Sequence, residues 1–453
     1  MDNQNFIPNR GIVINENEDL SYANSTLQSL SCLDIFYKIT NQNQFIQCLP
    51  NKSLTKEFFY LLYKIYNNPN KYVYSDGLID YFEKMYYKNK GNIISQNVLN
   101  HDAFHFLYFL LQFIHIEINN PMNPNYDISV LSNQTIQNQR NDSHMFQIFC
   151  DFYCKTQNSL ISGNFYNVEK HTFNCQNCGI FYFYNMKNIF RIDINRALFY
   201  RDSFFPKKKG GHVTLYDMFD YYFSPRQAQC KNCNNLGNED IKISIHNKVL
   251  IVNINRNSHN NNFSNDLNFD VNIDMKKYIN NEFGCYNYSL KSFIAFNGKY
   301  ISFGYINKNW YKFFDNNWSK VQNIKEFYQF EPQILIYERA DQNYNINQFN
   351  NNNQFNNIQN LNINNNNNNN NLNNNNLSNS TGTPFNRIKN SSFDNNNNIN
   401  NNNIHNCVSN KNNNIFHLKM GDIKPEFRIN SNNINSQLDP SILSLINDIG
   451  KDS

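Results

Sequence analysis

Apolar positions recur with the spacing of an α-helix near the start of the chain. They predict one buried helix from Ser21 to Phe36, because three leucines fall on one face of a helical repeat. The polar side chains of Asn24 and Ser25 stand near its first turn, where either could cap the helix. The three leucines are Leu27, Leu30 and Leu33.

A second helix is predicted from Asn100 to His115, where apolar side chains cover well over half of the helix circumference. A helix that is apolar on nearly all sides belongs inside a fold and not on its surface. Its two histidines, His105 and His115, are interpreted as residues of the core or its rim and not as metal ligands, because the rest of the helix is apolar.

After Asp151 the pattern changes to short segments in which apolar and polar residues alternate, as in half-buried β-strands. These segments are 181–184, 189–194, 248–254, 288–294, 300–306, 310–314 and 333–337. A helical first third followed by a β-rich remainder predicts an α+β fold whose two halves pack against each other.

The patterning ends near residue 340. Asparagine runs with almost no charge occupy residues 341–416, and mean hydropathy over the whole chain is −0.68. Such a segment cannot offset the entropy of ordering, so we expect it to be disordered. The folded domain is therefore predicted at 10–340, preceded by a flexible leader at 1–9.

Residues 417–453 form a tail with one short amphipathic helix, predicted at 439–449. Its boundaries rest on an Asp N-cap, a Pro in the first turn and a closing Gly, at Asp439, Pro440 and Gly450. A helix this short is not stable alone in water. It is expected either to dock back on the domain or, as the first choice, to fold onto a protein partner.

The overall charge excludes some functions. The 453 residues include 40 Lys and Arg against 36 Asp and Glu, a net charge of +4, which argues against direct nucleic-acid binding. No run of 18 apolar residues is present to span a membrane. The first residues also lack the basic and apolar regions of a secretory signal. The expected location is therefore the cytoplasm or the nucleus.

Ten cysteines in a chain without an export signal are expected to stay reduced, so their spacing indicates metal chemistry. Cys175 with Cys178, and Cys230 with Cys233, form two Cys-x-x-Cys pairs that together supply four thiolates to one tetrahedral Zn²⁺. Four cysteines leave no open position for catalysis, so the predicted zinc is structural. The other thiols are interpreted as buried or incidental: Cys32, Cys48, Cys150, Cys154, Cys285 and Cys407.

Several segments, taken in order, resemble the ubiquitin-specific proteases. Residues 22–30, Tyr-Ala-Asn-Ser-Thr-Leu-Gln-Ser-Leu, are similar to the box that follows the nucleophilic cysteine of that family. Residues 101–107, His-Asp-Ala-Phe-His-Phe-Leu, are similar to its Gln-Gln-Asp-Ala-x-Glu-Phe-Leu helix. The cysteine pairs lie where the family has its fingers zinc, and closing motifs match at 249–256, 288–290, 299–300, 310–313 and 334–337.

The resemblance implies a papain-like fold of thumb, palm and zinc-ribbon fingers, with the thumb at 10–150 and the fingers and palm at 151–340. It also implies that ubiquitin or a ubiquitin-like protein is the partner. The chain departs from the family in the loop before the catalytic histidine, because Phe296-Asn297-Gly298-Lys299-Tyr300 joins two motifs that the family usually separates. The loop that covers the substrate is therefore expected to be short.

The catalytic positions that the resemblance assigns hold other residues. Ser21 stands at the nucleophile, Lys299 at the histidine base and Phe314 at the Asp or Asn that orients the base. Asp315 matches the second acidic position of that motif, and Glu16 falls on the oxyanion Asn. A carboxylate there would repel a developing oxyanion.

These residues predict a catalytically inactive family member that acts as a ubiquitin-binding or scaffold module. Three alternatives remain. One is a spliceosome-associated inactive member, because that branch also has Tyr-Ala-Asn after its lost cysteine and Gly-Lys-Tyr in place of Gly-His-Tyr. The second and third are active deubiquitinases, one thiol-dependent and one built on a Ser21–Lys299 dyad. The dyad would need a buried lysine with a lowered pKa.

Overall fold

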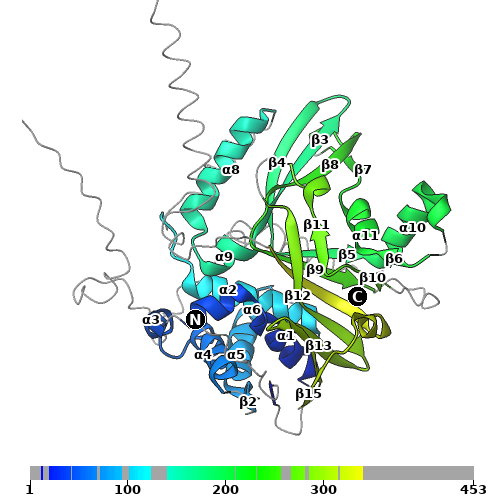
Figure 1. Ribbon diagram of the computed structural model, residues 1–453. Coiled ribbons are helices and arrows are strands. Elements are labelled where there is room, and N and C mark those ends of the chain that lie inside the picture. Colours follow the sequence, from blue (N-terminus) through cyan, green and yellow to red (C-terminus); the bar gives the residue numbers. More distant parts are fainter. Residues whose placement is uncertain are drawn as a thin grey trace, which may run out of the picture. The chain divides into compact units, whose positions relative to one another are not determined.

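The computed structural model describes residues 12–13, 20–41, 43–68, 72–93, 102–123, 140–209, 211–230, 232–256, 267–280, 285–314 and 317–339. Within them helices come first and strands dominate later, so the expected α+β class is confirmed (Figure 1). None of the helices in these ranges has the length and hydrophobicity that a membrane span requires. The leader 1–9, the Asn-rich segment 341–416 and the predicted tail helix 439–449 lie outside the described residues.

The first part of the chain is a group of helices around α6. Phe106, Leu107, Leu110 and Leu111 of α6 are completely buried, and the helix packs against α1, α4 and α5, so it lies inside the fold as predicted. Strands β1 (Ile12–Val13) and β2 (Val73–Tyr74) pair in parallel beside these helices. The helices are α1 (Ser21–Ser31), α2 (Asp34–Thr40), α3 (Asn43–Cys48), α4 (Leu54–Asn67), α5 (Asp76–Ile93) and α6 (Ala103–Ile118).

The single helix predicted from Ser21 to Phe36 is wrong, because the structure has two helices with a break at Cys32 and Leu33. The predicted cap is wrong as well. Helix α1 starts at Ser21, and Asn24 is buried inside it, where its amide donates to the Ile12 carbonyl and accepts from the Ser75 hydroxyl. The break exists because Glu338, from the last strand, accepts the Asp34 and Ile35 N–H groups at 2.9 and 3.2 Å and so starts a new helix.

Two carboxylates fix the ends of the thumb helices. Asp102 caps α6 by accepting the Phe104 N–H at 3.0 Å. At the other end of α6, Glu117 accepts the Leu54 and Thr55 N–H groups of α4 at 3.2 and 2.7 Å. The ends of α6 therefore hold the first turns of two helices in place.

The fingers are a four-stranded antiparallel sheet in the order β4-β3-β8-β7. Helix α8 (Asp142–Thr156) lies along β4, where the Tyr184 hydroxyl donates to Asp142 at 2.6 Å. The short helix α9 (Leu160–Phe165) leads into the sheet. The strands are β3 (Asn167–Cys175), β4 (Gly179–Lys187), β7 (Arg226–Gln229) and β8 (Leu236–Ile245).

The palm is an eight-stranded sheet in the order β15-β14-β13-β12-β16-β9-β5, with β11 paired to β12. Its pairs are antiparallel except β5 with β9. The strands are β5 (Ile189–Asp193), β9 (Val249–Asn255), β11 (Asn272–Asp274), β12 (Asn287–Asn297), β13 (Lys299–Ile306), β14 (Asn309–Phe314), β15 (Asn317–Lys320) and β16 (Glu331–Arg339). All seven predicted strand segments are confirmed.

Helices that the alternation did not predict interrupt the β-rich half. Besides α8 and α9, α10 (Ile194–Phe204) and α11 (Leu215–Tyr222) cover part of the palm, with β6 (Val213–Thr214) paired to β10 (Leu267–Asn268). Three 3-10 turns are η1 (Pro206–Lys208), η2 (Lys276–Tyr278) and η3 (Ile324–Gln329). Residues of α10, α11 and the palm strands form one continuous apolar core.

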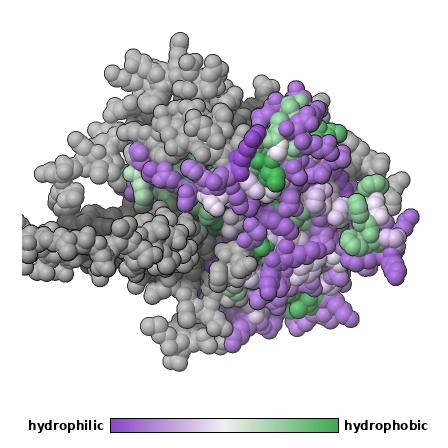
Figure 2. Space-filling model, turned by 90° about the horizontal axis from the view of Figure 1, so that it is seen from above, coloured by the Kyte–Doolittle hydropathy of each residue, from purple (hydrophilic) through white to green (hydrophobic). Residues whose placement is uncertain are grey.

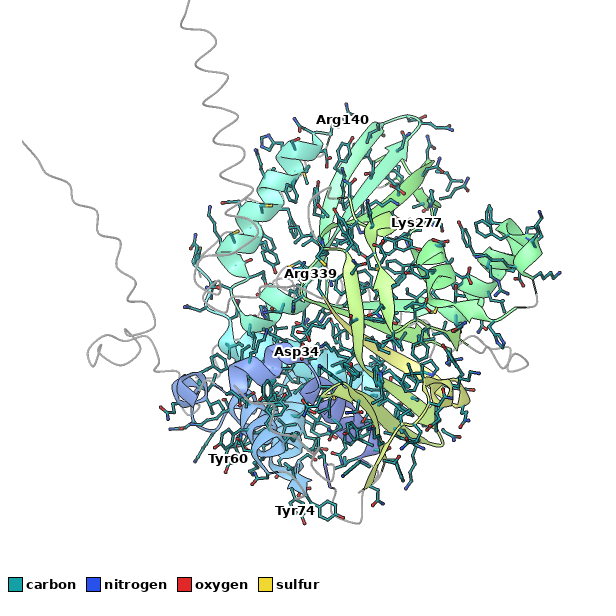
Figure 3. All side chains as sticks on the ribbon, in the orientation of Figure 1. Asp34, Tyr60, Tyr74, Arg140, Lys277 and Arg339 are labelled. Atoms are coloured by element: carbon teal, nitrogen blue, oxygen red, sulfur yellow. The ribbon has the colours of Figure 1, made fainter. Side chains whose placement is uncertain are left out.

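The two halves meet where α1 crosses β12, β13 and β14. The Ser292 hydroxyl donates to the Ser29 carbonyl at 2.9 Å, and Lys291 pairs with Asp34 at 2.7 Å; Figure 3 marks Asp34 and Arg339 near this junction. Gly304 of β13 allows the close approach, because a Cβ there would lie 2.3 Å from the Cys32 sulfur. The helical half therefore packs on the β-rich half, as predicted, through α1 and the strands β12, β13 and β14.

Candidate functional site

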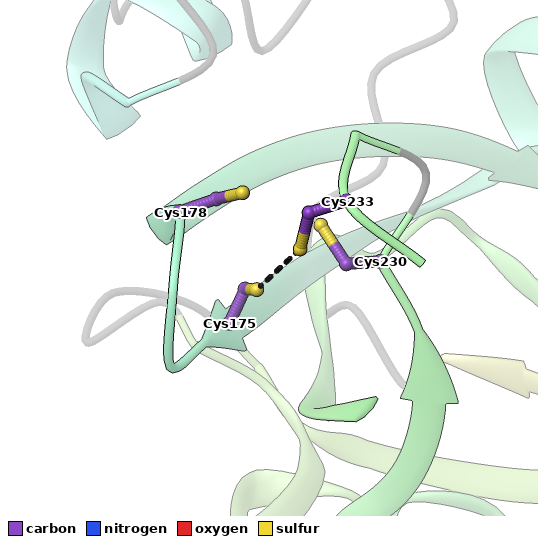
Figure 4. Close-up of side chains that lie close together, drawn as sticks. All are labelled: Cys175, Cys178, Cys230 and Cys233. Carbon is purple, nitrogen blue, oxygen red and sulfur yellow. Dashed lines mark hydrogen bonds between the residues drawn. The ribbon is translucent and has the colours of Figure 1, made fainter. Parts of the chain in front are cut away.

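The four cysteines of the two predicted pairs converge at the tip of the fingers (Figure 4). Their sulfur atoms all lie within 4.8 Å of one another, and Cys175 Sγ is 3.5 Å from Cys233 Sγ. Cys175 and Cys230 are buried, whereas Cys178 and Cys233 are half-buried. Fifty-five residues separate the pairs in sequence, counting from Cys175 to Cys230, and the β3–β8 pairing brings them together.

Local backbone geometry makes this convergence possible. Gly179 adopts φ +85° in the turn after Cys178, and Asn234 adopts φ +59° in the turn after Cys233. Gly237 must lack a side chain, since a Cβ there would lie 2.5 Å from the Phe173 ring. Burial alone would raise the pKa of Cys175, but the N–H groups of Cys178 and Asn177 bring this pKa down to about 7, whereas the contact with the Cys233 thiol raises the pKa of Cys178 to about 12.

The cluster fits a tetrahedral zinc ion. With Zn–S bonds of about 2.3 Å, the sulfurs of a four-thiolate site lie about 3.8 Å apart, close to the spacing found here. Soft thiolate ligands in this arrangement favour Zn²⁺ over Mg²⁺ or Ca²⁺. The four cysteines therefore form a set that could hold a metal.

A buried charged network lies deeper in the same sheet and was not predicted. His171 of β3 stands between two carboxylates, with Nδ1 2.9 Å from Glu239 and Nε2 3.5 Å from Glu169. Arg226 adds a 2.6 Å contact to Glu239, and the Tyr222 hydroxyl of α11 donates to Glu169 at 2.8 Å. The network ties the fingers to the palm. Sequence could not reveal it, because its members come from four different elements.

The resemblance places the nucleophile at the start of α1, where Ser21 faces β13. Its half-buried hydroxyl oxygen accepts the Tyr300 N–H at 3.4 Å. The nearest cysteine in sequence, Cys32, lies at the opposite end of α1, and burial raises its pKa to about 12. The described part of the α1–β13 contact therefore offers a hydroxyl and no activated thiol.

An unpredicted set of polar groups lies beside this contact. Tyr300 reaches α6 with its hydroxyl 3.2 Å from Asp102, and His105 Nδ1 is 2.6 Å from the other Asp102 oxygen. Burial tends to raise the pKa of Asp102, but His105 and the Phe104 N–H outweigh it, so this pKa is lowered. Asp102 thus caps a helix and pairs with a histidine at once.

The base position, Lys299, is the first residue of β13 and is exposed to solvent. It follows Gly298, whose φ of +75° closes the hairpin, and Lys299 pairs directly with Asn297 of β12. The prediction of a short loop is confirmed, since one residue separates the two strands. Lys299 therefore stands on the surface of the hairpin and not in a buried pocket.

The other predicted positions are only partly covered. Phe314 ends β14 and is half-buried, with the Lys312 ammonium 4.9 Å from its ring centre. Glu16 and Asp315 lie outside the described residues. Ser21 is the first residue of α1, Lys299 the first of β13 and Phe314 the last of β14. Their side chains provide a hydroxyl, an amine and a hydrocarbon ring.

The remaining predicted residues have structural positions. His115 is buried, its Nδ1 lies 2.6 Å from the Ser159 hydroxyl, and burial lowers its pKa to about 4, so the core interpretation is confirmed. Burial also raises the pKa values of Cys150 and Cys154, the latter to about 11. The side chains of Cys48 and Cys407 are outside the described part of the chain.

Comparison with protein families gives one match that covers most of the chain. The family described as ubiquitin carboxyl-terminal hydrolase matches residues 15–337. A comparison with curated proteins gives no match.

Solved structures of the SAGA DUB module are similar to this chain. A yeast SAGA DUB module with an Sgf73 mutant is 19% identical, with 74% of this chain and 69% of that chain covered and a TM-score of 0.49. A SAGA DUB module of Ubp8, Sgf11, Sus1 and Sgf73 bound to monoubiquitin is 18% identical, with 74% and 69% covered and a TM-score of 0.49.

Proposed function

The chain belongs to the ubiquitin carboxyl-terminal hydrolase family, and from that premise we propose that it is a non-catalytic member acting as a ubiquitin-binding or scaffold module. The observation that carries the proposal is the exposed Lys299 directly after the hairpin glycine, where the family resemblance puts the histidine base. The proposed module works on ubiquitin or a ubiquitin-like protein in the cytoplasm or the nucleus.

Each replacement removes one chemical role. A serine hydroxyl is far less acidic than a thiol, so Ser21 needs a neutral base within hydrogen-bond reach. Lys299 is exposed and lacks the burial that a general-base lysine has. Phe314 has no acceptor with which to orient a base. Because nucleophile, base and orienter act as a unit, the loss of all three leaves little of the rate enhancement.

The Ser21–Lys299 dyad is the sharpest competing hypothesis, and the exposure of Lys299 weighs against it. A lysine that acts as a general base is buried, because desolvation disfavours the charged form of a lysine, whereas Lys299 is exposed to solvent. The hydroxyl of Ser21 accepts the backbone N–H of Tyr300, so the β13 backbone contacts the serine.

We also propose that the four-cysteine cluster holds one structural zinc. When bound, the ion would fix the β3–β4 and β7–β8 turns relative to each other. Cys175, Cys178, Cys230 and Cys233 would supply all four ligands, so no coordination position remains for a water nucleophile. In this proposal the zinc keeps the fingers folded and takes no part in a reaction.

The test separates binding from catalysis. The full chain is titrated with unmodified ubiquitin, and in parallel incubated with ubiquitin whose C-terminus carries a thiol-reactive warhead. We expect saturable binding without covalent adduct. An active family enzyme treated in the same way serves as the positive control. An adduct that disappears with a cysteine substitution would refute the non-catalytic part, and absence of binding to any ubiquitin-like protein would refute the binding part.

A further inference from the structure

Helix α10 carries aromatic side chains that the palm core does not cover. Phe199 is 76% exposed, Phe204 67% and the following Phe205 43%, although all three lie within seven residues. Between these rings and α11 lies a groove of about 390 Å³, lined by Asn195, Arg196, Phe199, Tyr200, Phe204 and Tyr221. Apolar surface of this kind, gathered in one place, marks an interaction site.

The exposed rings stand on a rigid support. Arg201, in the last turn of the same helix, is 1% exposed and donates to the carbonyls of Gly211 and His212 at 2.9 and 2.8 Å. It thereby ties the end of α10 to the chain that returns from η1. Tyr200 contacts both Phe204 and Tyr221, with ring centres 4.7 and 6.0 Å apart. The groove is therefore formed before any partner arrives.

The rim of the groove is cationic. Residues 193–209 contain five Arg and Lys side chains against two carboxylates, Asp193 and Asp202. Arg201 is buried and pairs with Asp202, and Arg196 lies 3.9 Å from Asp193, so the remaining excess positive charge comes from three lysines. Arg196 lies in the groove lining and is exposed, and the exposed Lys207, Lys208 and Lys209 follow the aromatic residues after Pro206, with Lys208 paired to Asp217. In Figure 2 a pale green patch lies at the right-hand edge of the described surface, on the side where Figure 1 places α10, with hydrophilic residues beside it. The groove thus suits an amphipathic segment with acidic borders.

We propose that this groove is the docking site of the chain's own tail, residues 438–449, which folds into a helix on it. The tail offers the matching pattern. On a helical repeat, one stripe contains Leu438, Ile442, Leu445, Ile446 and Ile449. Asp439 borders that stripe on one side and Asp448 on the other. An apolar stripe between carboxylates complements an aromatic groove between cations.

The connecting chain is long enough for this contact. Residues 341–437 separate the end of the described domain from the tail segment. If they behave as the coil that their composition predicts, their root-mean-square span is about 55 Å. Tethering at such a length gives the tail an effective concentration near 1 mM, so a weak contact of about 100 µM would still be about nine-tenths occupied. The proposal does not rest on the ubiquitin-binding proposal, which assigns no role to this groove.

Hydrogen exchange of the full chain, read by mass spectrometry, tests the proposal. We expect the amides of 439–449 to exchange about tenfold more slowly than those of a free coil. Because the contact lies within one chain, this protection should not change when the protein concentration is raised from the micromolar range. Replacing Phe199 and Phe204 by Ser should remove this protection, and replacing Ile442 and Ile446 by Ser should in turn speed exchange along α10. The control is Tyr74→Ser with Tyr87→Ser, two exposed aromatic residues of the helical first half, 57% and 55% exposed.

A charge exchange sharpens the result. Arg196→Glu should weaken the protection of the tail. Asp448→Lys in the same chain should restore part of this protection, because the positive and negative charges of groove and tail are then exchanged. Protection that rises with protein concentration, together with dimers in light scattering, would refute docking in cis and assign the groove to the tail of a second copy. If the tail of the unmodified chain exchanges as fast as free coil, the proposal is refuted. Binding of the groove to anionic vesicles or to another protein would not rescue it.

Discussion

The fingers and the α1–β13 contact are both closely packed, but they differ in what their side chains can do. In the fingers, two cysteine pairs more than fifty residues apart in sequence meet with their sulfurs within 4.8 Å, a set that could hold a metal ion. At α1–β13, the backbone also comes together closely, and Gly304 lies against Cys32 with no room for a Cβ. The positions that the family resemblance assigns to the nucleophile and the base hold Ser21 and an exposed Lys299.

The difference teaches that packing and catalysis make separate demands on one fold. Holding α1 against the palm needs small residues and backbone hydrogen bonds, which Gly304 and Ser292 supply. Catalysis needs an acidic nucleophile and a neutral base in addition. On our proposal this chain meets the packing demand at α1–β13 and not the catalytic one. In the fingers a single set of residues meets both needs, because the four cysteines that would bind the metal are also the residues that would hold the turns together.

The largest expected effect is on the fingers. Replacing Cys230 by Ser removes one ligand, and because structural zinc sites contribute much of the folding free energy of small modules, we expect loss of zinc and unfolding of the β3–β4–β7–β8 sheet. Elemental analysis should fall from about one zinc per chain to well below it. Cys285→Ser, at a cysteine outside the cluster, is the control and should leave the zinc content unchanged. A stable fold with an intact fingers sheet after zinc removal would contradict a structural role.

The second effect tests packing at the α1–β13 contact. Gly304→Ala places a methyl group 2.3 Å from the Cys32 sulfur, and such overpacking should lower the free energy of unfolding by about 2–3 kcal/mol. Cys32→Ala in the same chain should recover part of the loss by opening space. Gly163→Ala is the matched control, because nothing lies within 4 Å of its Cβ. Equal effects of the two alanines in urea unfolding would show that this contact is not tight.

Much of this architecture is predictable from sequence, for reasons visible in particular residues. The palm strands follow from alternation because their pairing partners impose a period of two, and the spacing of the cysteine pairs alone predicts that the four cysteines form one cluster. The break between α1 and α2 is not predictable, because the carboxylate that caps α2 belongs to Glu338, 304 residues from Asp34. Helices α10 and α11 lie between strands in the sequence. Their runs of helical spacing are short, so the strand pattern on either side dominates a prediction from sequence.

The candidate site is predictable only as positions along the chain. Ser21 and Lys299 can be assigned by motif, but whether Lys299 is buried depends on the hairpin at Gly298. The contacts of Asp102 with His105 and Tyr300 depend on where α6 starts relative to β13, which no local pattern fixes. Tertiary packing therefore decides the chemistry that motifs leave open.

The third effect concerns the charged network of the fingers and gives a pH dependence. Burial opposes the ionised form of Glu239, but His171 and Arg226 lower its pKa to about 2. Its stabilising contribution is therefore present above its unfolded pKa near 4.5 and lost as the pH falls toward 2. His171, whose pKa its two glutamates raise against burial, contributes fully below 6.5 and loses that contribution as the pH rises through its folded pKa.

Glu239→Gln should thus cost about 2 kcal/mol of unfolding free energy at pH 5.5 and less at pH 3 and at pH 8. Urea unfolding at the three pH values measures the difference from the unmodified chain. Asp151→Asn is the control, since this half-exposed carboxylate pairs with Lys155 on the surface of α8. A cost that does not change with pH would show that the network is not ionised as described.

The smallest effect is expected at the nucleophile position itself. Ser21→Ala removes an acceptor 3.4 Å from the Tyr300 N–H, a long hydrogen bond whose loss should change stability by about 0.5 kcal/mol. Ubiquitin binding should be unchanged, because the proposal assigns the hydroxyl no role in it. Calorimetry of both proteins measures both quantities. Binding that weakens more than threefold would assign Ser21 a function that our account denies.

The most direct test of the central claim is turnover of ubiquitin that carries a fluorogenic group at its C-terminus. The account predicts no release of the fluorophore by the full chain above the uncatalysed rate, and the same result for Ser21→Cys, because exposed Lys299 and Phe314 still supply neither a base nor a residue to orient one. Release by the unmodified chain that Ser21→Ala or Lys299→Met abolishes would contradict the account and establish a serine–lysine hydrolase.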